Sequence, residues 1–240
     1  MKLMFVAAIL MTILTSLALC RAQAPPTIEE TLSKEGVGLS NEALLSSLIK
    51  SPKVGVRASA AVLLAQRGYT PAIPAMNAAL QKESDPTGRL DLAGALDRLG
   101  QSSGLSALEA LCNDPKLPAD LRLNAAGRSL THGGGTCAAA MTGVLSASDN
   151  PAVQSAALNY FLDSRLPAST IDVDSADLTK GLHGALDSEV ADVRRRSAEC
   201  IGRFKLSSER SHLLAVMRVE SNSNAKAAMQ KTVNELASPK

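Results

Sequence analysis

Two stretches far apart in the chain share one pattern: SPKVGVRASAA at residues 51–61 and SEVADVRRRSA at residues 188–198. Each places a valine directly before an arginine, Val56-Arg57 and Val193-Arg194, and small residues follow three and four positions later. Residues that recur at intervals of three and four lie on one face of an α-helix. Both stretches therefore predict the start of a helix whose small-residue face is buried.

The same pair, a small or apolar residue followed by a long polar one, recurs through the chain. We call the second member of each pair the marker residue of its unit; the markers are Arg57, Arg89, Arg122, Gln154, Arg194 and Lys226. They follow one another at steps of 32 or 33 residues, except for one step of 40 that contains residues 166–176. A fixed period of this length is typical of repeat architectures, and the long step predicts an inserted loop.

Each marker is preceded by a second apolar helix pattern, and the two patterns are separated by turn residues. Proline stands between them at Pro52, Pro86 and Pro151, and units end at Arg67-Gly68 and Leu99-Gly100. Proline is tolerated in the first turn of a helix, and glycine is common just past a helix end. The sequence thus predicts six units of helix, turn and helix over residues 39–238.

The composition predicts an all-α protein. Of 240 residues, 45% are hydrophobic but only 2% are aromatic, and tryptophan is absent. The apolar content comes mainly from Ala and Leu, which favour helices, whereas strands favour β-branched and aromatic residues. The 25 basic and 23 acidic residues nearly balance, so the chain lacks the basic surface and the stacking side chains that nucleic acids need. We expect no nucleic-acid partner.

The arrangement resembles the HEAT-repeat family, in particular its short bacterial form, over nearly all of residues 39–238. The two stretches quoted above carry the resemblance. It implies a right-handed α-solenoid of about six repeats, with second helices on the concave side and first helices on the convex side. The family pattern has an Asp about six residues before each marker, and the two form a ladder between units. This chain lacks that Asp, and the equivalent positions hold Ser51, Glu83, Lys116, Ser148, Ser188 and Glu220.

The N-terminal segment has the pattern of a secretory signal peptide over residues 1–22. A positive start precedes an apolar run over residues 3–20, and small residues follow. We expect cleavage near Ala22, a linker over residues 23–38, and a secreted or periplasmic protein without stable membrane insertion. Cleavage at this point leaves 23 basic and 23 acidic residues. A lipoprotein signal ending at Cys20 and a retained membrane anchor remain as alternatives.

The sequence contains no recognisable motif for catalysis. HExxH, GxSxG and P-loop patterns are all absent from it. None of His132, His183 and His212 has another histidine, a cysteine or a carboxylate at a convincing metal-ligand spacing. We therefore expect no catalytic residue, no cofactor and no metal, with His183 an ordinary surface histidine.

Three cysteines remain once the signal peptide is removed. In the repeat register Cys112 and Cys137 are offset by seven positions on parallel first helices, which is about 10 Å along the axis. The spacing between neighbouring helices adds about 8 to 10 Å, and a disulfide spans at most ~7 Å between Cα atoms. We therefore favour free thiols in the core for Cys112, Cys137 and Cys200, with a bridge as the alternative.

Two charged stretches have a possible binding role. The stretch Asp172–Asp177 spaces carboxylates at alternate positions, but it lacks the glycine and the glutamate of an EF-hand loop. A solvated loop that ends in a helix cap is the simpler interpretation. The run Arg194–Arg196 could bind an anionic partner, yet Asp192 and Glu199 are near enough to compensate its charge.

We therefore expect an exported, non-enzymatic scaffold or protein-binding module, monomeric, that holds a protein or peptide on its concave face. Positions one, two, five or eight after a marker should face outward from the second helices; the expected contacts are Asp91, Asp97, Asn124, Asn159, Arg195 and Glu199. A HEAT-like enzyme or enzyme accessory is one alternative, because some HEAT-like proteins resemble chromophore lyases and base-excising glycosylases. Calcium binding or envelope tethering through the Asp172–Asp177 loop is the other.

Overall fold

The computed structural model describes residues 25–130 and 135–237, which form helices and turns and contain no strand. The all-α prediction is therefore confirmed. The α-helices are α2 (Ile28–Lys34), α3 (Asn41–Lys50), α4 (Val54–Gln66), α5 (Ile73–Lys82), α6 (Pro86–Arg98), α7 (Ser102–Asn113), α8 (Ala119–Ser129), α9 (Ala138–Ser146), α10 (Pro151–Leu162), α11 (Ala176–Leu186), α12 (Ala191–Phe204), α13 (Arg210–Val219) and α14 (Ser223–Ala237). Short 3-10 helices precede four of them: η1 (Thr70–Ala72), η3 (Gly135–Cys137), η4 (Ala168–Thr170) and η5 (Ser207–Glu209).

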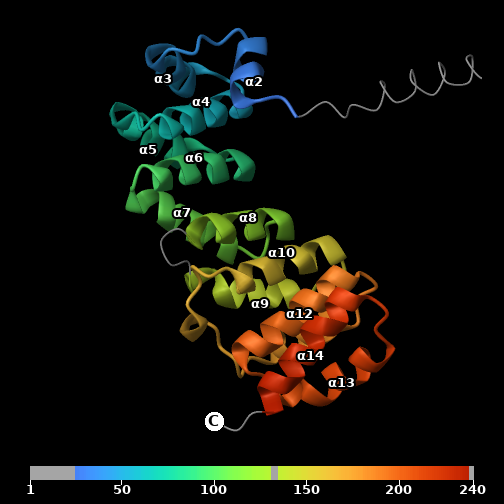
Figure 1. Cartoon of the computed structure of the whole chain (residues 1–240). Helices are drawn as coiled ribbons and strands as arrows, with labels where there is room; N and C mark the ends of the chain where they lie inside the picture. The colour runs from blue at the N-terminus through green and yellow to red at the C-terminus, as the bar shows by residue number, and fades with distance from the viewer. Residues whose placement is uncertain (1–24, 131–134, 238–240) are drawn as a thin grey trace, which may run out of the picture.

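Helices α3 to α14 pair into six units that stack in chain order (Figure 1). In each unit an odd-numbered first helix is followed by an even-numbered second helix. Each second helix contacts the second helix of the next unit, from α4 against α6 to α12 against α14. The described chain is thus an α-solenoid, as the repeat pattern predicts.

The marker residues occupy one fixed position in this architecture. Each is the fourth residue of a second helix, from Arg57 in α4 to Lys226 in α14. A residue in the first helical turn can reach back to the carbonyl groups of the preceding turn, and Arg57 donates to Ser51 O at 3.0 Å. Gln154 makes the same contact, because its Nε2 donates to Ser148 O at 3.0 Å.

The expected turn residues act at the helix ends. Pro86 and Pro151 open α6 and α10, where their missing N–H groups cost nothing. Asp85 caps α6 by accepting from Gly88 N–H at 2.7 Å. Gly68 and Gly100, just past α4 and α6, have φ values of 65° and 73°, in the left-handed region that favours glycine.

The structure contains a helix within the segment that the sequence suggested as a linker. Thr27 caps α2 with a capping box, in which Thr27 Oγ1 accepts from Glu30 N–H at 3.1 Å and Glu30 Oε2 accepts from Thr27 N–H at 2.9 Å. Leu32 is fully buried, and α2 packs against α4. Helix α2 therefore covers the first end of the solenoid.

Two hydrophobic clusters make up the core of the described residues, and they meet at α6. Leu92 faces the cluster of the first units, whereas Leu90 and Ala93 face the cluster of the later units. Helix α7 lies so close to α6 that a Cβ on Gly104 would sit 2.4 Å from Asp97 N. Only glycine fits at this crossing.

The long step between markers corresponds to the connection between α10 and α11. Leu166 and Ile171 are buried within it. Arg203 of α12 donates to Leu162 O at 3.1 Å and to Leu166 O at 2.5 Å. These hydrogen bonds hold the inserted segment against α12. Where the segment ends, Ser175 caps the N-terminus of α11 by accepting from Leu178 N–H.

A ladder between units forms at two junctions, with glutamate in place of the usual Asp. Arg57 pairs with Glu83 of the next unit, and Arg194 pairs with Glu220 of the next unit. Burial disfavours a charged Glu83, but its hydrogen bonds from Arg57 and from Asp85 N–H outweigh this, so its pKa is lowered.

In the part of the chain that the structure describes, the middle units show no such pair. Arg122 donates instead to Cys112 O at 3.0 Å and to Ala140 O at 3.4 Å. The Nε of Arg89 is buried and has no hydrogen-bond partner among the described residues. In the next unit, the position six residues before the marker holds Lys116 and not an acid, so Arg89 forms no ladder pair there.

Candidate binding site on the second helices

Three hollows lie between consecutive second helices and contain five of the six residues that the sequence suggested for binding. We call them hollow 1, between α4, α6 and α8; hollow 2, between α8 and α10; and hollow 3, between α12 and α14. Two further hollows lie along the first units, one lined by α3 and α5 residues.

Hollow 1 has a volume of about 750 Å³ and contains Asp91 and Asp97. Asp91 pairs with Arg128 of α8 at 2.8 Å, and both side chains are partly exposed. Asp97 is only 6% exposed, so it lies in the floor of the hollow. This differs from the expectation that its side chain faces outward. Ile28 of α2 completes the wall.

Arg128 lies across α6 because Gly94 leaves space for it. Its Nη1 donates to Leu90 O at 3.0 Å, and a Cβ on Gly94 would sit 2.6 Å from that same nitrogen. Sequence analysis missed Arg128 because it falls six positions after its marker, outside the spacings considered.

Hollow 2 is about 340 Å³ and is mainly apolar, with Leu123, Leu130 and Val153 among its lining residues. Asn124 and Asn159 lie in it as expected. At its edge Arg165 binds Asp163 with two hydrogen bonds, of 2.9 and 2.7 Å. These bonds lower the pKa of Asp163 to about 2. An apolar floor with amide side chains above it is suited to an extended peptide, which offers apolar side chains and backbone polar groups.

Hollow 3 is about 320 Å³ and contains Glu199, with Lys231 and Glu235 on the α14 side. Arg195 is not among its lining residues, because it pairs along its own helix with Asp192 at 2.7 Å and Glu199 at 2.5 Å. The expected compensation of the Arg194–Arg196 run is therefore present.

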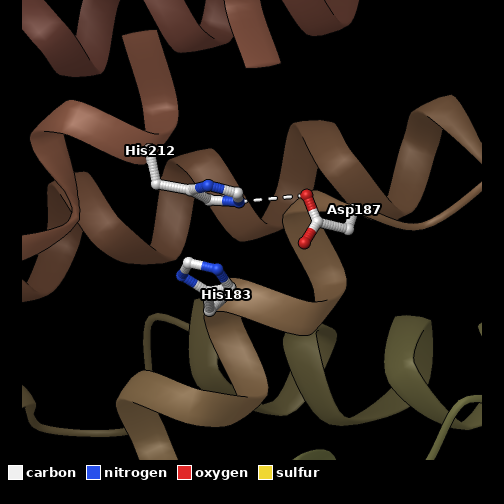
Figure 2. A group of neighbouring side chains, drawn as sticks. All are labelled: His183, Asp187 and His212. Carbon is white, nitrogen blue, oxygen red and sulfur yellow. Dashed lines mark ion pairs between the residues drawn. The ribbon is translucent and has the colours of Figure 1, made fainter. Parts of the chain in front are cut away.

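A side-chain cluster that the sequence did not predict lies where α11 meets α13 (Figure 2). The rings of His183 and His212 stack with centroids 3.7 Å apart and planes 16° apart. Asp187 Oδ1 is 3.0 Å from His212 Nε2, and Glu209 Oε2 is 3.0 Å from His183 Nδ1. His183 is exposed at the surface, as expected, but it is not isolated, because His212 and Glu209 contact its ring.

The register of the repeats contained a signal for this cluster. His183 lies 11 positions before marker Arg194, and His212 lies 14 positions before marker Lys226. Their neighbouring first helices therefore hold them about 4.5 Å apart along the axis. Asp187 follows His183 by four positions and so shares its helix face.

The prediction of free thiols at Cys112 and Cys137 is wrong. These residues form a disulfide, with Cα atoms 5.8 Å apart. Cys137 lies in η3, outside the register of the first helices, and η3 contacts α7, where Cys112 is near the end. Cys200 is a buried free thiol, as expected, and burial raises its pKa.

The carboxylates of the Asp172–Asp177 loop do not converge on one point. Asp172 Oδ1 accepts from Asp174 N–H at 3.2 Å, and Asp177 Oδ1 accepts from Ser146 Oγ at 3.2 Å. In the part of the chain that the structure describes, one group of three possible metal ligands lies close together, and it is His183, Asp187 and His212.

A match to a protein family supports the fold. Residues 41–131, which span α3 to α8, match the family described as HEAT repeats. The solved structure of the complex of CpcE and CpcF of phycocyanin lyase from Nostoc sp. PCC7120 is similar to this chain at 20% identity, over 88% of this chain and 100% of that chain, with a TM-score of 0.39. At that TM-score the likeness carries no argument. No curated protein sequence matches this chain.

The N-terminal predictions fall largely outside the described residues. The expected signal peptide at residues 1–22 lies outside the described residues. Among residues 25–130 and 135–237, no helix has the length and apolar character needed to cross a bilayer.

Proposed function

We propose that this HEAT-like repeat protein is an exported, monomeric, non-enzymatic scaffold that binds a protein or peptide along its second helices. The observation that carries the proposal is the row of hollows, in which a charged hollow 1 is followed by an apolar hollow 2 that contains Asn124 and Asn159. Repeat solenoids characteristically bind partners on extended surfaces of this kind.

Hollows 1 and 2 suggest what such a partner offers. Asp91 and Arg128 are partly exposed at hollow 1, so a charged residue of the partner can replace either member of their pair. An apolar side chain would enter hollow 2, and its backbone would meet Asn124 and Asn159. An extended segment with a charged residue followed by an apolar one fits both hollows.

Export is supported by the disulfide as well as by the sequence of residues 1–22. The Cys112–Cys137 bond belongs to an oxidising compartment, because thiols in the cytosol are kept reduced. Intact-mass measurement of the full chain, expressed with a C-terminal tag, tests this. A product that begins at Gln23 supports export, and an uncut chain in the cytosol contradicts it.

Chemical crosslinking in the cell envelope, followed by capture through the tag, tests partner binding. The full chain is compared with two variants: Asp91→Lys with Arg195→Glu, which reverses charge on second helices, and Ala156→Trp, which fills hollow 2 without a charge change. Ala156 is exposed, so the larger side chain does not enter the core. A partner crosslinked to the native chain and lost from both variants supports the proposal.

The matched control is Glu42→Lys with Arg218→Glu. It makes the same kinds of charge reversal on exposed residues of first helices α3 and α13. We expect it to capture the partner as the native chain does. Equal capture by every variant, or loss in the control alone, would contradict binding along the second helices.

A further inference from the structure

The cluster at the junction of α11 and α13 has the donor set of a transition-metal site. His183, Asp187 and His212 each offer one ligand atom, and these three atoms lie within 4.8 Å of one another. Two ligands of a tetrahedral metal are about 3.4 Å apart when each bond is about 2.1 Å long. Closing the cluster around an ion therefore requires shifts of about 1 Å, which the exposed side chains of His183 and Asp187 can make by small rotations.

Glu209 holds the ring of His183 in one orientation. In many metal sites a carboxylate does the same for a histidine that binds the metal. The Glu209 side chain is 8% exposed and lies in η5, immediately before α13, with Oε2 3.0 Å from His183 Nδ1. A carboxylate on one ring nitrogen fixes the orientation of the imidazole and leaves the other nitrogen for the metal. His183 Nε2 is then the atom available for coordination.

His212 provides an independent observation that points to a ligand. Its Nε2 atom is buried from solvent and makes no hydrogen bond of acceptable geometry, although Asp187 Oδ1 is 3.0 Å away. Figure 2 shows this nitrogen facing the carboxylate while the ring of His183 lies beneath. An ion bound between the two groups would satisfy both, because nitrogen and oxygen would each donate a lone pair to it.

We propose that His183, Asp187 and His212 bind a divalent transition metal of the zinc class, with Glu209 as the positioning residue for His183. Two imidazoles and one carboxylate favour zinc and its neighbours over calcium and magnesium, which prefer oxygen ligands alone. Three protein ligands leave at least one coordination position open to water or to a group from a partner. This site lies on first helix α11 and at the start of α13, so the proposal stands apart from binding along the second helices.

Isothermal titration calorimetry of the full chain with zinc chloride alone, with calcium chloride in a parallel run, tests the site. We expect one zinc ion per chain and no calcium heat. The variants Asp187→Asn and His212→Gln should each weaken zinc binding at least about tenfold, and Glu209→Gln should weaken it about 10- to 100-fold through loss of orientation. Zinc should also raise the melting temperature of the native chain and not that of His212→Gln.

Two controls separate this site from adventitious binding. His132→Gln removes the third histidine, and Asp174→Asn removes an exposed aspartate of the neighbouring loop; we expect native zinc affinity for both. Cobalt substitution should add visible absorption bands that disappear in His212→Gln, and circular dichroism confirms that each variant is folded. Absence of zinc heat, or native zinc affinity in both Asp187→Asn and His212→Gln, would overturn the proposal and leave only a cluster of ion pairs.

Discussion

Arg194 binds Glu220 of the next unit with two hydrogen bonds, from Nε to Oε2 at 2.6 Å and from Nη2 to Oε1 at 2.8 Å. The Glu220 side chain is fully buried, and it also accepts from Asn222 N–H at 2.8 Å. Arg194 in turn donates to Ser188 O at 2.7 Å, so it fastens its own inter-helix turn to the following unit.

Loss of this pair should weaken the C-terminal units. Glu220→Gln leaves the partly buried guanidinium of Arg194 without its counter-charge, and we expect the free energy of unfolding to fall by about 3 kcal/mol. Urea unfolding followed by circular dichroism measures this. Replacing both partners, as Arg194→Met with Glu220→Met, should cost less than Glu220→Gln. Glu235→Gln is the matched control, because its pair with Lys231 is exposed and 3.8 Å long; an equally large loss there would contradict the argument.

Acid should destabilise the protein through the same carboxylates. Hydrogen bonds from Arg194 lower the pKa of Glu220, and the pKa of Glu83 is also lowered in the folded chain. Carboxyls with depressed pKa values bind fewer protons in the folded state than in the unfolded state, so their stabilisation is complete above the unfolded value of about 4.3 and is lost as the pH falls below it.

Urea unfolding between pH 3 and pH 7 measures this dependence. We expect a flat stability from pH 7 to about 5 and a decline below that range, with a shallower decline for Glu220→Gln. A native chain whose stability did not change down to pH 3 would show that these carboxylates do not couple protonation to folding.

Reduction of the disulfide should lower stability in the middle of the solenoid. Cys112 and Cys137 are 25 positions apart, and opening a loop of this length is expected to cost about 3 kcal/mol in the chain-entropy view. Unfolding with and without dithiothreitol measures the cost, and Cys112→Ser with Cys137→Ser should make the difference vanish. Peptide mapping after denaturation without reductant should find only Cys200 alkylated among Cys112, Cys137 and Cys200; alkylation of all three would refute the bridge.

The crossing of α6 and α7 should tolerate no side chain at Gly104. A Cβ there would sit 2.4 Å from Asp97 N and 2.6 Å from Ala93 O, both backbone atoms that cannot move alone. We expect Gly104→Ala to lower the melting temperature and to cost about 2 kcal/mol. Gly143→Ala is the control, because its Cβ would meet nothing within 4 Å in helix α9; it should be neutral or stabilise by about 0.5 kcal/mol. A similar effect of both changes would contradict the close crossing.

The second helices could be predicted from the sequence because they repeat. The predictions that were wrong concern residues where the chain departs from the repeat. The markers fell at the fourth position of all six second helices because the pattern of buried small residues is local. Cys137 was misplaced because a 3-10 turn precedes α9 and carries that residue outside the helical register. The ladder acids were present in the sequence as Glu83 and Glu220, but their pairing depends on contacts between units that one unit does not encode.

The candidate sites show the same contrast between features set by the repeat and features set by contacts between units. Asn124 and Asn159 reached hollow 2 because their distance from a marker determines the helix face. Asp97 was expected to face outward, yet it is buried against the close crossing with α7. The pairing of His183 with His212 depends on the register of two neighbouring first helices, which the sequence of either helix alone does not show.

The disulfide also determines how the molecule would respond to mechanical tension. If a partner and a tether pull on opposite ends of the solenoid, the units can come apart one by one, but the segment between Cys112 and Cys137 cannot lengthen. At about 3.4 Å for each extended residue, the closed loop shortens the fully extended chain by roughly 85 Å. In an oxidising environment the fully unravelled molecule would therefore be shorter than its sequence allows, and a reductant would release the remaining length.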